Sequence, residues 1–350
     1  MTETNPVPWQ NSRQSTPAGQ RQQRGRWGFT QRSTAQTIFT TEFTMAQTIL
    51  NSRGWTVDGI TRGRWTLFGD TVFAATEGIT TAAGTINTLS GNDNLLGTVT
   101  TGTGTEAAHV AGVMVMADTR LNLGFGDDQI IGEAPVVAGS FNFGVDNEGA
   151  LDTGYGNDTI KGISRFGVYN GYTGSITTGE GNDKIIGESS DAGGGTSDFG
   201  LINHGYIFMG AGRDSITASK STNGIFNDKT IQMGDGADTV DALIGGASGA
   251  PGGFQGGGLI ELGRGNDVLK GFGDGTFKGN EGTDTLILQD GTYTFTPFGN
   301  DLQVTATTGS GATMTINSFE ALGGAASTAF TSLAGITAAT VFQIDGGVVV

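Results

Sequence analysis

The chain has 350 residues, 63 of them glycine and none of them cysteine, and its formal net charge at pH 7 is −16. The absence of a strict Gly-X-Y period excludes collagen, and the absence of cysteine excludes disulfides and thiolate metal sites. Charged residues make up only 15% of the chain and apolar residues recur at strand spacing, which excludes a chain that is disordered throughout and indicates an all-β protein.

The N-terminal residues 1–35 differ from the rest of the chain, because they are rich in Gln, Ser, Pro and Arg and contain few aliphatic residues. This composition predicts a disordered basic leader, either a solvated segment or an anchor to an anionic surface. Its aromatic residues are too sparse to indicate nucleic-acid binding. No apolar run is as long as a membrane helix requires, about 18 residues, and no signal-peptide core is present, so we expect neither a transmembrane segment nor a cleavable secretion signal.

A repeated turn occupies residues 86–290, after residues 36–85, which we interpret as an N-terminal cap of strands or a short helix. In every copy an aspartate follows a glycine by two residues and precedes an aliphatic residue by two; the copy GEGNDKIIG begins at Gly179. The eight aspartates are Asp93, Asp128, Asp158, Asp183, Asp214, Asp238, Asp267 and Asp284. Eight copies at this spacing are typical of a solenoid.

Each turn lies between two short predicted strands, because another apolar residue stands seven positions before each aspartate. The glycines supply the positive φ angles that such a turn needs. A looser third strand precedes each unit, marked by Val113 and Val115, Phe143 and Val145, Phe199 and Leu201, and Ile225 and Phe254. Three short strands per coil predict a parallel β-solenoid, similar to a β-helix or β-roll, with long coils.

The C-terminal residues 291–350 change to longer strands of period 2, separated by turn signals such as the Asp-Gly pair at 290–291. We expect them to form a β-rich C-terminal cap. Caps of this kind are needed because the bare edge strands of an open stack recruit other chains.

The repeated turn favours cation binding. Its glycines expose backbone carbonyls, its aspartate adds a carboxylate, and stacking places these carboxylates about 5 Å apart. Neighbouring carboxylates would then repel each other by roughly 3 kcal/mol at an effective dielectric of about 20. Calcium suits oxygen ligands in a flexible geometry better than magnesium does. Zinc is disfavoured, because cysteine is absent and His109 and His204 are the only histidines.

These units resemble the hemolysin-type calcium-binding repeat of the RTX family, whose nonapeptide is Gly-Gly-x-Gly-x-Asp-x-hydrophobic-x. The resemblance implies that the eight aspartates are Ca²⁺ ligands and that the chain folds outside the cell on meeting calcium. It implies carbonyl donors at Gly126, Gly156, Gly181, Gly212, Gly236 and Gly265, with Asp127, Asn157, Asn182 and Asn266 beside the ligands. The C-terminal stretch also resembles the ends of RTX proteins exported by type I secretion, whose signal is C-terminal and uncleaved.

The sequence departs from the family pattern in two respects. Family nonapeptides run in tandem, whereas most units here have one turn per long coil, and only residues 263–286 approach the tandem form. Arg213 and Ala237 replace the Asn or Asp beside the ligand in two turns. We therefore expect calcium along one edge only, with weaker sites at those two turns.

Two other interpretations stay open. Gly-x-Gly-Asn-Asp is good turn chemistry without any ion, although aspartate in all eight copies favours a role for the charge. Long-coiled solenoids also include polysaccharide lyases, hydrolases and epimerases, and a groove where His204, a carboxylate and Arg165 converge would favour such an enzyme. The candidate groups are His204, Tyr206, Asp198, Arg165, Lys184 and Asp146. We assign no catalytic residue among them.

The sequence thus predicts a secreted, calcium-binding β-solenoid without catalytic activity, located outside the cell or on its surface. Its expected role is that of a structural, surface-layer or adhesin component. Its expected partners are calcium and either further copies of the chain or a cell-surface polysaccharide.

Overall fold

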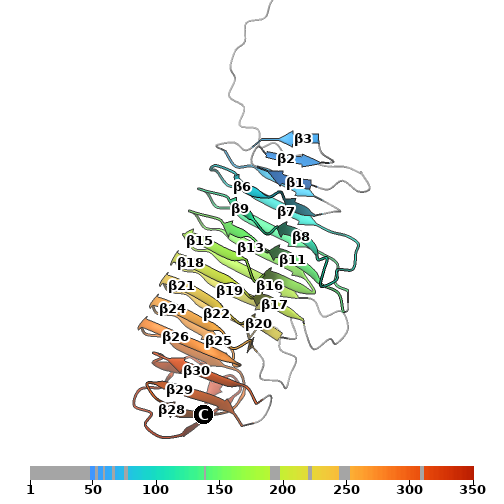
Figure 1. The fold of residues 1–350 in the computed structure, drawn as a ribbon. Coiled ribbons are helices and arrows are strands. Elements are labelled where there is room, and N and C mark those ends of the chain that lie inside the picture. Colours follow the sequence, from blue (N-terminus) through green and yellow to red (C-terminus); the bar gives the residue numbers. More distant parts are fainter. Residues whose placement is uncertain are drawn as a thin grey trace, which may run out of the picture. The chain divides into compact units, whose positions relative to one another are not determined.

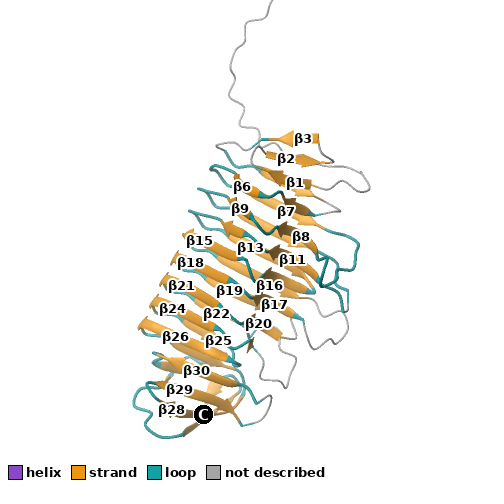
Figure 2. Ribbon diagram, viewed as in Figure 1, coloured by secondary structure: helices purple, strands orange, loops and turns teal. Residues whose placement is uncertain are grey.

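The computed structural model describes residues 48–350 except for 52–53, 58–59, 65–67, 75–77, 138, 190–197, 220–222, 244–252 and 308–310. The prediction of a disordered leader lies outside this described part. The described residues all fall within one compact unit. Its described residues form strands and no helix (Figure 2), which confirms the all-β class. Accordingly, no described helix has the length and apolarity needed to cross a membrane.

The strands form three sheets. In spatial order, sheet 1 contains β23 (Phe254–Gln255), β20 (Asn223–Asn227), β17 (Phe199–Asn203), β14 (Phe166–Asn170), β11 (Asn142–Asn147), β8 (Val110–Val115), β5 (Ile79–Thr81), β1 (Thr48–Asn51), β2 (Gly54–Val57) and β3 (Ile60–Gly63). Sheet 2 contains β32 (Thr331–Ser332), β31 (Ala321–Gly324), β27 (Thr285–Leu288), β25 (Val268–Lys270), β22 (Thr239–Asp241), β19 (Ser215–Ser219), β16 (Lys184–Ser189), β13 (Thr159–Ser164), β10 (Gln129–Glu133), β7 (Asn94–Thr98) and β4 (Thr71–Ala74). Sheet 3 contains β34 (Val348–Val349), β33 (Thr340–Asp345), β28 (Gly291–Phe298), β29 (Asp301–Ala306), β30 (Thr313–Asn317), β26 (Gly275–Gly282), β24 (Leu259–Gly265), β21 (Thr230–Gly236), β18 (Tyr206–Gly212), β15 (Ser175–Glu180), β12 (Ala150–Asp152), β9 (Thr119–Asn122) and β6 (Gly84–Asn87).

Successive repeat units add one strand to each sheet. β15 of sheet 3, β16 of sheet 2 and β17 of sheet 1 follow one another in the chain, and each pairs in parallel with its equivalents in the units before and after. Figure 1 shows these strands lying beside those of the neighbouring units from β6 to β26. The long parallel sheets are consistent with the predicted solenoid.

The core is formed by apolar columns that were predicted from the repeat. Residues two positions after and seven positions before each aspartate are at most 1% exposed. They are Leu95, Ile130, Ile160, Ile185, Ile216, Val240, Leu269 and Leu286, and Ile86, Leu121, Leu151, Ile176, Ile207, Ile231, Ile260 and Phe277. Burying one such side chain contributes about 1.5–3 kcal/mol, so these columns hold the sheets together.

Sheet 1 departs from simple alternation. Val113, Val145, Leu201 and their equivalents join the main core, but Phe143 packs in a second cluster with Ala111, Phe166, Phe199 and Ile202 on the other face of the sheet. The cause is the glycine after Phe143. A Cβ on Gly144 would collide with the backbone of Gly162 and Ile163 in sheet 2, so position 144 faces inward and the phenylalanine before it faces outward.

Both ends of the stack are covered by antiparallel strands. β2 and β3 continue sheet 1 beyond β1, and β28 and β29 continue sheet 3 beyond β30. Parallel pairing already begins at β1, which pairs with β5, and continues with β4, inside the segment 36–85 that was interpreted as a cap. The outermost strands at these ends are therefore β3 in sheet 1 and β34 in sheet 3.

An asparagine ladder, which the sequence analysis did not anticipate, lies where sheet 1 turns into sheet 3. The buried side chains of Asn147, Asn170, Asn203 and Asn227 are linked by amide N–H to carbonyl O hydrogen bonds of 2.7–2.8 Å. A buried amide of this kind is stable only when it is hydrogen-bonded. The ladder fixes the register at this corner.

Candidate metal centre

The eight predicted aspartates lie in one column where sheet 3 turns into sheet 2. Each is at most 2% exposed, because its side chain points inward from the turn. The backbone N–H of each aspartate donates to Oδ1 of the aspartate in the next unit, at 2.7–2.9 Å from Asp93 through to Asp284. The column continues at both ends, since Asp70 N–H donates to Asp93 and Asp284 N–H donates to Glu320 Oε2 at 2.7 Å. We call these eight residues the carboxylate column.

The second carboxylate oxygen, Oδ2, is buried without a hydrogen-bond partner in all eight described aspartates. Three threonine hydroxyls adjoin the column, but each donates its proton to a backbone carbonyl of the next unit: Thr88 to Leu123, Thr153 to Thr178, and Thr178 to Met209. Leaving a buried polar oxygen unpaired costs about 1–3 kcal/mol, and more when the group is charged. The column therefore requires a positive partner, either a proton or a cation.

Burial raises the pKa of every carboxyl group in the column. The pKa reaches about 7 in Asp93, Asp128 and Asp238 and about 6 in Asp158, Asp214 and Asp284. In Asp183 and Asp267 burial also raises the pKa. The neighbouring hydroxyl of Thr88 opposes this rise most in Asp93, and backbone N–H groups oppose it in all eight, with Thr153 and Thr178 adding to the opposition in Asp158 and Asp183. Neighbouring carboxylates add to the rise in six of the eight. Without a cation, the carboxylate column would thus take up protons near neutral pH.

Backbone oxygens lie beside the carboxylates, as the repeat predicted. A Cβ added to Gly236 would collide with the carbonyl of Gly212 and would lie 3.1 Å from Asp238 Oδ1. The same relation holds at Gly265, whose added Cβ would collide with the Gly236 carbonyl. The carbonyls at the predicted glycine positions 126, 156, 181, 212 and 236 each face the glycine of the following unit. This set of oxygens fits a hard cation.

A second column limits the space beside the carboxylates. The residue five positions before each aspartate faces inward, and its equivalents stack in register through sheet 3. These residues are Thr88, Leu123, Thr153, Thr178, Met209, Met233, Leu262 and Gly279, and we call them the inner column. A Cβ on Gly279 would collide with Asp284 Oδ2 and with the carbonyl of Ser318. The other seven units carry a side chain at this position, whereas Gly279 has none.

The four residues predicted beside the ligands lie elsewhere. Asp127, Asn157, Asn182 and Asn266 are exposed, on the solvent side of the turn. Their Oδ1 atoms accept hydrogen bonds from backbone N–H groups of the next unit, for example Asn157 Oδ1 from Asn182 N–H at 3.0 Å. Asn157 donates two hydrogen bonds to Asp127 Oδ1, one from its backbone N–H and one from its side-chain amide, and these two bonds lower the pKa of Asp127. The four residues form an outer ladder, separate from the buried oxygens.

The three groups proposed to mark a catalytic groove do not converge. Arg165 precedes β14 and binds Asp198, which precedes β17, at 2.8 Å. His204 follows β17 and contacts Asp228 at 2.8 Å, at the opposite end of the same strand. Among the described residues, a different group has metal-ligand geometry: His109, Asp146 and Glu148, on the outer face of sheet 1. Sequence reasoning missed it because the histidine lies 37 residues from the aspartate.

No family model matches this chain, and no curated protein matches it either. The RTX resemblance therefore rests on the turn motif alone. The carboxylate column is the feature that makes this motif a candidate cation site.

Proposed function

We propose that this chain is a parallel β-solenoid of the RTX type that acts outside the cell as a structural, surface-layer or adhesin component, and that calcium stabilises it. The observation that supports the proposal is the carboxylate column, in which eight buried aspartates each keep one oxygen without a partner. A stable column of charges needs a cation, and its oxygen-only surroundings favour calcium.

Calcium, when bound, would supply the positive charge that the Oδ2 atoms lack. The residues of the chain contribute the rest. Each Oδ1 holds the backbone of the preceding unit, so one aspartate serves two units at once. A carboxylate column that assembles only when the units stack makes cation binding and folding a single event. Low calcium inside the cell would then leave the acidic chain unfolded for export, in agreement with type I secretion.

The inner column predicts where the cation binds best. Beside Gly279 lie Asp284 Oδ2 and the carbonyl oxygen of Ser318, and Glu320 Oε2 accepts the backbone N–H of Asp284. In the units with Met209, Met233 or Leu262 an apolar side chain occupies the equivalent position, and there the carboxyl group is expected to depend on a proton. We therefore expect fewer calcium ions than aspartates.

The experiment is far-UV circular dichroism of the untagged chain in chelator at pH 8, during titration with CaCl₂ and separately with MgCl₂. We expect a transition from coil to β structure at calcium concentrations near 10⁻⁴–10⁻³ M, the range of extracellular calcium modules, and a weaker response to magnesium. A full β spectrum in chelator that calcium does not alter would overturn the proposal.

A further inference from the structure

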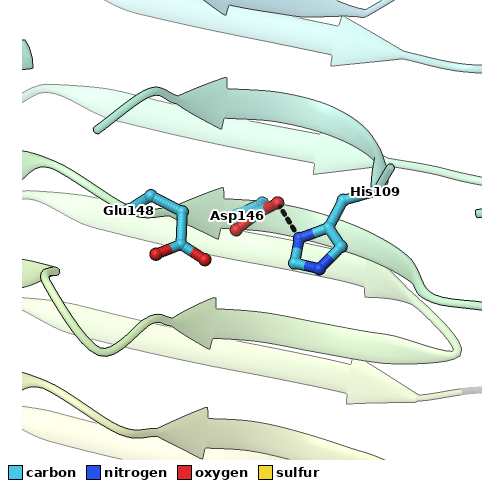
Figure 3. A group of neighbouring side chains, drawn as sticks. All are labelled: His109, Asp146 and Glu148. Carbon is cyan, nitrogen blue, oxygen red and sulfur yellow. Dashed lines mark hydrogen bonds and ion pairs between the residues drawn. The ribbon is translucent and has the colours of Figure 1, made fainter. Parts of the chain in front are cut away.

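A second group of ligands lies on the outer face of sheet 1, away from the carboxylate column. His109 precedes β8, Asp146 belongs to β11, and Glu148 follows β11. His109 Nδ1 lies 2.8 Å from Asp146 Oδ2, and one ligand atom from each of the three residues lies within 4.8 Å of the other two. Figure 3 shows the Asp146 carboxylate between the imidazole ring and the Glu148 carboxylate.

The buried aspartate of this group is only half satisfied. Asp146 is 1% exposed, and its Oδ1 has no hydrogen-bond partner among the described residues. In Figure 3 this oxygen, the one without a dashed line, points to the side where the Glu148 carboxylate lies. Two carboxylates beside a single imidazole leave an excess of negative charge, which a buried site tolerates only when a proton or a cation offsets it.

The surroundings hold the imidazole in place and lower the local dielectric. The His109 ring lies 4.6 Å from the ring of Phe143 and 5.6 Å from that of Tyr169, measured between centroids. Its side chain remains 18% exposed, so a cation can enter from solvent. Two tetrahedral ligands on one ion at 2.0–2.2 Å lie about 3.3–3.6 Å apart, so a bound ion would replace the hydrogen bond of 2.8 Å after a shift of less than about 1 Å.

We propose that His109, Asp146 and Glu148 bind one divalent transition-metal ion, with zinc the preferred metal. One imidazole nitrogen and two carboxylate oxygens are ligands that zinc accepts, and imidazole distinguishes the site from the oxygen-only carboxylate column. Three protein ligands leave the fourth tetrahedral position open to water or another molecule. The site uses none of the residues of the carboxylate column.

The chain supplies its own matched control. His204 pairs with Asp228 at 2.8 Å, as His109 pairs with Asp146, and its ring stacks on Tyr172 with centroids 4.4 Å apart. Among the described residues no third ligand completes a group around His204. His109 and His204 are the only histidines and cysteine is absent, so few other groups compete for zinc.

The test is isothermal titration of the untagged, calcium-containing chain with ZnCl₂. We expect one zinc ion per chain, binding at least about tenfold more weakly in His109→Ala and in Glu148→Gln, and unchanged in His204→Ala. Circular dichroism of each variant shows whether it is folded. If a variant does not fold, X-ray absorption of the wild-type zinc complex replaces it, and one imidazole in the coordination shell is the expected result.

Three results would overturn the proposal. They are no zinc binding by the folded wild type, equal weakening by His204→Ala and His109→Ala, and a zinc complex whose absorption spectrum contains no imidazole.

Discussion

Asp183 illustrates what one residue does in this structure. Its Oδ1 accepts the N–H of Asp158, its own N–H donates to Asp214, and its Oδ2 has no partner. An asparagine would keep the accepting oxygen and remove the charge. Asparagine could accept the same hydrogen bond, so the occurrence of aspartate in all eight units indicates that the negative charge itself has a role.

Two adjacent aspartates allow a matched substitution that separates charge from turn chemistry. Asp128 is buried in the carboxylate column, and Asp127 is exposed in the outer ladder, where other units have asparagine. In chelator at pH 6, where protons still stabilise the carboxylate column, we expect Asp128→Asn to raise the free energy of unfolding, because the substitution removes the cost of burying this carboxyl group, and to reduce the additional stability gained with calcium. Asp127→Asn should change neither quantity by more than about 0.5 kcal/mol.

Urea unfolding of both variants, with and without calcium, measures these quantities. An Asp128→Asn protein that gains as much stability from calcium as the wild type would show that this carboxylate does not bind the ion.

Part of the site was predictable at this scale and part was not. The aspartates and the carbonyl-donating glycines follow from the repeat itself. The inner column was also visible, since Leu123 and Met209 stand two residues after an inward position, but the motif drew attention to the turn only. His109, Asp146 and Glu148 were beyond reach, because only the pairing of β8 with β11 brings these side chains together.

At the scale of the element, the turn depends on close stacking of glycines. Gly181 has a φ of 144°, and a Cβ there would collide with the carbonyl of Gly156 in the preceding unit. Gly299 also has a positive φ, of 66°, but nothing lies within 4 Å of an added Cβ. The first position combines backbone strain with a collision, whereas the second has strain alone.

We expect Gly181→Ala to lower the free energy of unfolding by about 3 kcal/mol or more, and Gly299→Ala by about 1 kcal/mol. Thermal unfolding of the calcium-loaded proteins measures the difference. Equal losses would indicate that backbone strain alone, and not the contact between units, requires glycine in the turn.

The asparagine ladder gives a second prediction for an element. Asn203→Ala removes the oxygen that accepts from Asn170 and the amide that donates to Asn227, and it leaves both partners buried. The expected loss is about 1–3 kcal/mol, measured by urea unfolding. Asn157→Ala, in the exposed outer ladder, is the control and should cost less than about 1 kcal/mol. Similar losses would show that burial does not distinguish the two ladders.

The strands were predicted unequally well. The strands of sheets 2 and 3 lie directly before and after the repeated turn, at a fixed number of residues from its aspartate, so their inward residues could be assigned by alternation. The strands of sheet 1 were predicted less well, because loops of differing length precede them. In addition, Gly144 faces inward, so the side chain of Phe143 lies on the outer face and not in the main core as the alternation with Val145 predicted. β4 and β5 were assigned to the cap, since the turn motif is not recognisable that early in the chain.

At the scale of the whole molecule, net charge and burial act together. The chain carries a net charge of −16, and eight of its carboxyl groups lie inside the stack. Because their pKa is raised, the folded chain binds more protons than the unfolded chain between pH 4 and 7. Stability without a cation is therefore greatest below the ordinary pKa of aspartate and falls as the pH rises through about 6–7. A bound cation should remove this dependence.

The most direct test of the carboxylate column is the free energy of unfolding measured from pH 4 to pH 8, once in chelator and once with 5 mM calcium, a saturating concentration of about five times the expected millimolar affinity. The predicted result is a loss of stability in chelator that proceeds as the pH rises from about 4 through 6–7 and leaves the chelated chain unfolded at pH 8, and a nearly constant stability with calcium, so that the two curves separate progressively above about pH 4. Two curves that coincide over the whole range would contradict calcium binding by the column.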